Sequence, residues 1–106
     1  MKISVWNVEN MTGYKPMTTF WQDFSIADNF GIDAIKDTFD RAFKEWRTNY
    51  KYLTELVLVL NHKCWEHYEI DNRKARLYNK LYEDANDYAI THLKDVELEY
   101  YFKTID

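Results

Sequence analysis

Glycine and proline are scarce in this chain of 106 residues. Gly13, Pro16 and Gly31 are the only three, whereas ordinary usage would supply on the order of a dozen. The turn-rich sandwich and barrel folds are therefore disfavoured. Glycine-rich phosphate loops are excluded as well, because the two glycines are too far apart for either nucleotide-binding motif. The enzyme classes that depend on those loops are excluded with them.

Cysteine and long apolar runs are also lacking. Cys64 is the single cysteine, so no internal disulfide can form and burial must stabilise the fold, which fits a reducing cytoplasm. The longest aliphatic run, Leu56–Leu60, is far shorter than the roughly 20 residues that span a bilayer. No apolar signal-peptide stretch follows Met1 and Lys2. We therefore expect a single cytoplasmic domain that does not contact a membrane.

Apolar residues recur at three- and four-residue steps through most of the chain, which is the periodicity of amphipathic helices. Aromatic residues make up 18% of the sequence and can fill the core of so short a chain. We predict a mainly α fold, a compact bundle of four to five helices. Residues 18–106 form the helical body, and residues 1–17 form an N-terminal extended arm and turn. The apolar stripe from 33 to 69 fits one long helix or two, with a break near Thr48 and Asn49 favoured because helices average about 11 to 12 residues.

Residues with capping chemistry mark where the helices begin and end. Thr19 and Gln22 fit a capping box at the start of the first helix, and Gly31 follows that helix at a position for a left-handed C-terminal cap. Asp33 is predicted to cap the second helix and Asn72 the helix after the turn at residues 70–72. A last helix begins at Asp95.

The N-terminal arm contains a short alternation of β-branched and aromatic residues from Lys2 to Val8. We interpret it as an edge strand or extended arm. It must pack against helices, pair with residues 11–17, or pair with another chain, so a homo-oligomer through Lys2 to Val8 is one expectation.

His62, Cys64 and His67 are the most conspicuous metal-ligand types. At about 100° per residue, His62 and Cys64 point to different sides of a helix, so they cannot share one ion. A zinc site on Cys64 and His67 would need two more ligands, and core packing of Cys64 with peripheral histidines is favoured. We expect no metal, no cofactor and no catalytic residue: a buried thiol has a raised pKa, and the carboxylate pairs have the spacing of solvated helix faces.

Three basic residues, Arg73, Lys74 and Arg76, fall in the first turns of a predicted helix. The helix dipole disfavours positive charge there by about 0.3 to 1 kcal/mol each. We expect them to pair with Glu66, Glu69 or Asp71 across the turn; the alternative is a contact patch for an acidic or phosphate-bearing partner.

Negative charge is concentrated in the last quarter of the chain. The whole chain has 14 basic and 18 acidic residues, a net charge of −4, and residues 81–106 alone sum to −5. This balance gives no support to direct nucleic-acid binding. Acids and tyrosines of this region form either a solvated outer face or a surface for a basic protein partner. The predicted partner-binding residues are Glu83, Asp84, Asp87, Asp95, Glu97, Glu99, Tyr82 and Tyr100, with Tyr88 and Tyr101 nearby.

Three stretches, residues 19–28 (TFWQDFSIAD), 52–63 (YLTELVLVLNHK) and 92–104, resemble small accessory proteins of plasmids and conjugative elements in Gram-positive bacteria. This resemblance implies a setting in which short acidic proteins include anti-CRISPR and anti-restriction inhibitors. Such inhibitors act by binding a host nuclease. The resemblance supplies no shared motif from which inhibitory residues could be taken.

These observations predict a non-enzymatic protein that inhibits a host RNA-guided defence nuclease by occupying its basic nucleic-acid-binding groove. The alternative is a self-associating structural or regulatory helical module with no nuclease partner. A small-ligand binder lined by aromatic residues is a third class.

Overall fold

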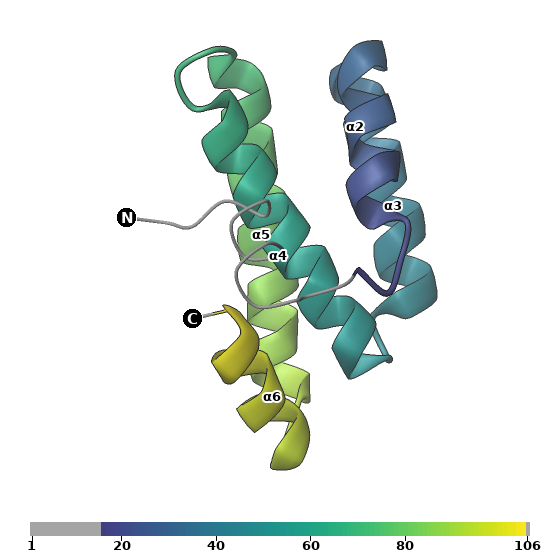
Figure 1. Ribbon diagram of the computed structural model, residues 1–106, viewed down its shortest axis with the longest axis vertical. Coiled ribbons are helices and arrows are strands. Elements are labelled where there is room, and N and C mark those ends of the chain that lie inside the picture. The colour runs from purple at the N-terminus through teal and green to yellow at the C-terminus, as the bar shows by residue number, and fades with distance from the viewer. Residues whose placement is uncertain (1–15, 106) are drawn as a thin grey trace.

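Five helices joined by short turns make up most of residues 16–105, the part of the chain that the computed structural model describes (Figure 1). They are α2 (Phe20–Phe30), α3 (Ile32–Trp46), α4 (Tyr50–His67), α5 (Asn72–His92) and α6 (Val96–Ile105). The prediction of a mainly α bundle is confirmed. The predicted arm or edge strand at Lys2 to Val8 lies outside the described residues.

α4 is the central helix of the bundle. It is apolar on nearly all sides, as expected for a helix that neighbours surround, and it packs against α2, α3, α5 and α6. Leu53, Val57 and Leu60 are fully buried on it. α5 runs antiparallel to α4 (Figure 1). Its small side chains Ala85 and Ala89 are fully buried in the core.

α2 and α3 form a helical hairpin that packs on one side of α4 (Figure 1). Gly31 alone connects the two helices, with φ 110° and ψ −169°, a conformation that is open essentially to glycine only. Its amide donates to the carbonyl of Ala27 at 3.0 Å, and its carbonyl accepts from the amide of Ile35 at 3.1 Å. Gly31 ends α2 with a positive φ, but the predicted left-handed cap is wrong, because its ψ is extended rather than left-handed helical.

The long apolar stripe is divided into two helices, as favoured from the sequence. α3 ends at Trp46 and α4 begins at Tyr50. Asn49 caps α4, because its side chain accepts a hydrogen bond from the amide of Tyr52 at 3.2 Å. The apolar period continues across the break because both helices face the same core.

Three of the predicted caps are wrong in detail. Thr19 precedes α2, but its side chain accepts no capping bond; its hydroxyl donates to the carboxylate of Asp23 at 2.9 Å. Asp33 lies inside the first turn of α3. Asp71, not Asn72, caps α5 by accepting from the amide of Lys74 at 3.2 Å.

α6 folds back against α4 and α5 and closes one end of the bundle (Figure 1). Tyr101 is its fully buried residue, and its hydroxyl donates to the side-chain carbonyl of Asn86. Burial raises the pKa of Tyr101, with Tyr82 and Asp87 adding to the effect. Among the described residues, no helix combines the length and the apolar character that crossing a bilayer requires.

Candidate functional site

The predicted partner-binding acids lie on two elements. Glu83, Asp84 and Asp87 are exposed on the side of α5 opposite its buried residues. Asp95 is exposed in the turn before α6. Glu97 is half-buried and Glu99 exposed in the first turn of α6, where negative charge suits the helix dipole. We call these six carboxylates, with Tyr82 and Tyr100, the acidic surface.

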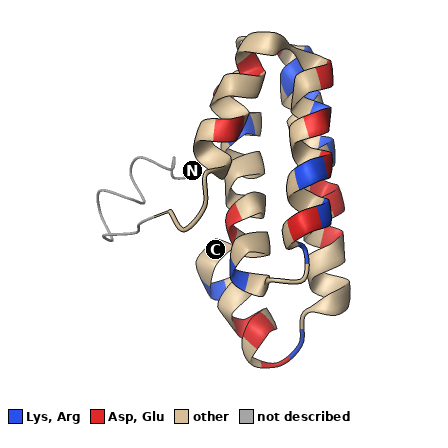
Figure 2. Ribbon diagram, turned by 90° about the vertical axis from the view of Figure 1, so that its right-hand side faces the viewer, with Lys and Arg blue, Asp and Glu red and all other residues tan. Residues whose placement is uncertain are grey.

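Lysines and arginines of the described chain neutralise little of this acidic surface. Asp84 receives the ammonium of Lys80 at 3.2 Å, and both side chains are well exposed. The other five carboxylates form no ion pair with any residue from 16 to 105. Acidic and basic residues are interleaved along other helices of the bundle (Figure 2). Exposed acids of α3, such as Asp37, Asp40 and Glu45, also form no ion pair with a described residue, so the acids of α5 and α6 are set apart by their concentration in one part of the chain.

The tyrosines of this region are less available than the sequence suggested. Tyr82 and Tyr100 are half-buried, and the ring of Tyr100 packs edge-on against Tyr50 with 5.3 Å between centroids. Tyr88 is half-buried and stacks on His92. Tyr101, expected beside the acids, is a core residue. Tyr101 lies three residues after Leu98 and four before Ile105, so it shares the apolar face of α6 with them.

A buried ionic cluster, which was not predicted from the sequence, joins α2, α4 and α5. Its centre is Lys63, whose side chain is 5% exposed. The ammonium donates to Ser25 Oγ at 3.1 Å, Asp28 Oδ2 at 3.0 Å and Glu66 Oε2 at 3.1 Å, so all three of its protons are used. The hydroxyl of Tyr78 donates to the other oxygen of Asp28.

The surroundings of the cluster shift two pKa values. Hydrogen bonding from His62 lowers the pKa of Glu66 to about 2; the charges of Lys63 and His62 add to this, and burial opposes it. Burial raises the pKa of Tyr78, and its hydrogen bond to Asp28 raises it further. The cluster is therefore organised as a neutral phenol and two carboxylates around one buried cation.

The oxygen and nitrogen ligand atoms of Asp28, Glu66 and His67 lie within 4.8 Å of one another, which is close enough for a metal site. His67 Nε2 is 3.1 Å from Asp28 Oδ2, but it is not aligned for a hydrogen bond. The ammonium of Lys63 already lies between the two carboxylates, where an ion would have to bind. A divalent cation would have to displace a fully hydrogen-bonded lysine, so the geometry favours a structural ion-pair network.

Cys64 and His67, considered together as metal ligands from the sequence, are separated in the structure. Cys64 lines a groove between α4 and α5, whereas His67 contacts Asp28 of α2. Cys64 is half-buried, and burial raises the pKa of its thiol, as expected. The expected peripheral position of the histidines is wrong for both His62 and His67, whose side chains are each only 12% exposed. The spacing of Lys63, Glu66 and His67 on one helix face was a usable signal, but their partner Asp28 is 35 residues away from Lys63 along the chain.

A second buried carboxylate holds the segment before α2. Glu55, 1% exposed on α4, accepts from the amides of Met17 at 2.8 Å and Thr18 at 2.9 Å, and from the hydroxyl of Thr18. Burial of this charge is therefore compensated by several donors.

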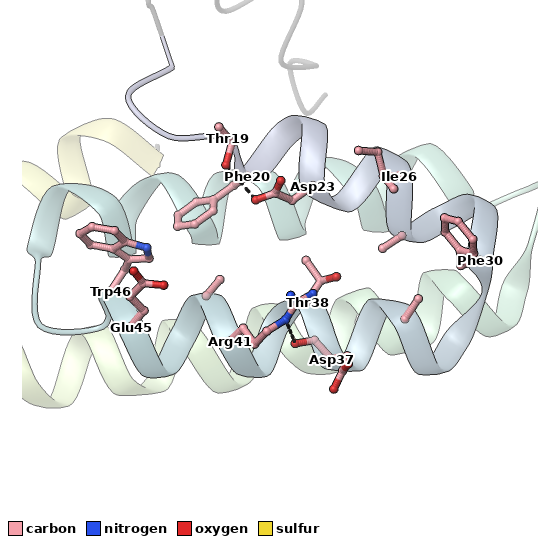
Figure 3. Close-up of a pocket in the computed structure, with 13 residues that line it drawn as sticks. Thr19, Phe20, Asp23, Ile26, Phe30, Asp37, Thr38, Arg41, Glu45 and Trp46 are labelled. Carbon is pink, nitrogen blue, oxygen red and sulfur yellow. Dashed lines mark hydrogen bonds between the residues drawn. The ribbon is translucent and has the colours of Figure 1, made fainter.

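A groove of about 590 Å³ runs between α2 and α3 (Figure 3). Asp23 of α2 faces Arg41 and Thr38 of α3 across it, while Phe20 and Trp46 lie toward one end and Phe30 toward the other. Arg41 donates to the backbone carbonyl of Asp37 at 3.4 Å. Acidic, basic and apolar side chains all line this groove. No two of the lining residues are arranged as a pair of catalytic groups.

The basic residues at the start of α5 are only partly neutralised. Lys74 lies 4.0 Å from Asp71 and donates to the backbone carbonyl of Asp28 at 2.7 Å. Arg73 and Arg76 are exposed and pair with no residue that the structure describes. The expected pairing across the turn is therefore confirmed for Lys74 and wrong for the two arginines.

No family model, curated protein or solved structure matches this chain. Function is therefore proposed from its own side chains together with the resemblance of its three stretches to accessory proteins of mobile elements.

Proposed function

We propose that this protein is a non-enzymatic inhibitor, encoded by a mobile element, that acts in the cytoplasm by binding a host RNA-guided defence nuclease. Its acidic surface occupies arginines and lysines that otherwise hold the phosphates of guide RNA or target DNA. Inhibition is by occlusion and requires no cofactor.

One observation carries this proposal: five of the six carboxylates of the acidic surface have no ion pair within residues 16–105. A carboxylate already paired with a neighbouring lysine has little to offer a cationic partner, whereas an unpaired, exposed one attracts it over several ångströms. Complementary charge steers association and disfavours wrong partners. The half-buried rings of Tyr82 and Tyr100 add rigid contact area beside the acids.

Charge reversal of Glu83, Asp84 and Asp87 to lysine tests the proposal. The wild-type chain is added to a panel of RNA-guided DNA nucleases loaded with guide RNA, and cleavage of a matched target is measured. We expect the wild type to block at least one nuclease and the triple variant to lose that inhibition. Circular dichroism verifies that both have the same helix content.

The matched control reverses three exposed acids on another helix, Asp37, Asp40 and Glu45 of α3. It changes net charge by the same amount but leaves the acidic surface intact, so it should inhibit like the wild type. Retained inhibition by the α5 variant would remove this surface from the mechanism. Failure of the wild type against every nuclease would remove the nuclease as partner.

A further inference from the structure

The outer face of α5 carries its charges in an order that opposes the helix dipole. Arg73, Arg76 and Lys80 lie in the first half of the helix, and Glu83 and Asp87 lie in the second; all five side chains are exposed. The N-terminal end of a helix favours negative charge and the C-terminal end favours positive charge. This effect falls off within the first and last turns, so among these five residues it acts chiefly against Arg73.

These residues also form one continuous stripe. The positions 73, 76, 80, 83, 87 and 90 follow one another at alternating steps of three and four, the spacing with which a helix presents a seam to a second helix. Ile90, 46% exposed, ends the stripe with an apolar side chain. We call these six residues the α5 stripe.

A second copy of the α5 stripe, laid antiparallel, is complementary to the first. When the two-fold axis passes midway between residues 81 and 82 of each α5 helix, Arg76 faces the second copy's Asp87. Lys80 then faces the second copy's Glu83. Each pair occurs twice by symmetry, as in any isologous interface. Arg76, Glu83 and Asp87 have no ion pair among the described residues, and Lys80 has only its exposed contact with Asp84.

An apolar groove flanks the basic half of the stripe. It has a volume of about 660 Å³ and lies between α4 and α5. Trp65 and Tyr68 line it on the α4 side, 53% and 60% exposed, with 5.4 Å between their ring centroids. Arg76 and Lys80 line it on the α5 side, and the groove extends as far as Glu83 of the acidic half. In the antiparallel register, Ile90 of the second copy lies level with residue 73, at the end of the groove where Tyr68 is found.

We propose that the α5 stripe and this groove form a two-fold dimer interface with a second copy of the chain. The self-complementary order of charges selects the second copy over other occupants, since an all-basic or all-acidic partner would repel half of the stripe. Exposed aromatic rings beside arginine are typical of interface cores. This proposal is independent of nuclease inhibition, but it covers Glu83 and Asp87, so the dimer and a nuclease complex exclude each other.

Sedimentation velocity over about 1 to about 100 μM tests the dimer, because association follows protein concentration. We expect wild-type dimers that dissociate on dilution and weaken as salt is raised, since exposed ion pairs are screened. A wild-type monomer throughout this range would overturn the proposal, whatever the nuclease assay shows.

Two reciprocal variants test the register. Arg76→Glu with Lys80→Glu makes the stripe acidic, and Glu83→Lys with Asp87→Lys makes it predominantly basic. Each variant alone should be monomeric, an equimolar mixture should form a heterodimer, and the chain carrying all four changes should dimerise again. Folded variants that dimerise alone, or that fail to associate when mixed, would overturn the interface.

Two further variants complete the test. Asp37→Lys with Asp40→Lys on α3 alters charge elsewhere and should leave the dimer intact. Loss of the dimer in this variant would mean that net charge, not the α5 stripe, controls association.

Trp65→Ala with Tyr68→Ala tests the groove and should weaken the dimer at least tenfold. Unchanged dimerisation in this variant would overturn the proposal that the groove forms part of the dimer interface.

Discussion

The ammonium of Lys63 on α4 donates a hydrogen bond to the carboxylate of Asp28 on α2, with 3.0 Å between nitrogen and oxygen. Lys63 is one of the few charged residues buried in the described chain, and its partners come from α2 and α4. This contact joins α2, and with it the helical hairpin of α2 and α3, to the central helix.

Lys63→Met is expected to destabilise the fold strongly. It leaves the carboxylate of Asp28, 12% exposed, without its counter-ion, and breaking a buried pair in this way costs about 3 to 5 kcal/mol. Urea unfolding followed by circular dichroism measures the loss. Lys80→Met, which breaks the exposed pair with Asp84, should cost only about 0 to 1 kcal/mol. Equal losses in the two variants would contradict a structural role for the cluster.

Glu55→Gln is expected to release the segment before α2. The amides of Met17 and Thr18 both donate to the carboxylate, and a carboxamide offers one acceptor oxygen in place of two. A buried donor left unsatisfied costs about 1 to 3 kcal/mol. Hydrogen exchange should become faster at these two amides, whereas Glu69→Gln, an exposed change, should leave them as in the wild type. Unaltered exchange in Glu55→Gln would show that something else holds the segment.

Stability should fall as the solution is made acidic, in a window set by Glu66. Its pKa is lowered from 4.5 to about 2 in the folded chain, chiefly by hydrogen bonding from His62. A depressed carboxyl pKa stabilises the fold above the unfolded pKa, and this contribution is lost as the pH falls from about 4.5 toward about 2. Urea midpoints at the two ends of this range should differ more for the wild type than for Glu66→Gln. The same pH dependence in both proteins would exclude Glu66 as its source.

Gly31→Ala should destabilise the hairpin of α2 and α3 although there is room for a methyl group. No atom lies within 4 Å of the position that a β-carbon would take, so the cost comes from φ 110° and ψ −169° alone. For a residue other than glycine, this combination of φ and ψ costs about 1 to 3 kcal/mol of conformational energy. Asn29→Ala, an exposed change inside α2, should be neutral or slightly stabilising, because alanine favours helix. A thermal midpoint unchanged by Gly31→Ala would mean that the turn relaxes to a negative φ.

Helical periodicity and the residues with turn chemistry were enough to predict the elements of the described fold. The steps of three and four predicted every helix from α2 to α6, and Asn49 and Gly31 marked two of the boundaries, because these signals depend on neighbours within one or two turns. The predicted caps failed because a helical pattern does not fix which polar residue near a helix start accepts from its free amides. Thr19 bonded to Asp23, and Asp71 capped in place of Asn72.

The sequence by itself determined the helical class of the protein and the acidic character of its last quarter, because both follow from local pattern and composition. Local ion pairs such as Lys80 with Asp84 also follow from spacing along one helix, but only the tertiary structure decided which charges have partners on another helix. Lys63 and Asp28 lie 35 residues apart along the chain, and Met17 and Glu55 lie 38 apart, yet each pair is in contact. Arg76 and Glu83 pair with nothing in the described chain and lie on an exposed helix face. Pairing of charges between helices depends on how the helices pack side by side, and no periodicity within a single helix encodes that distance.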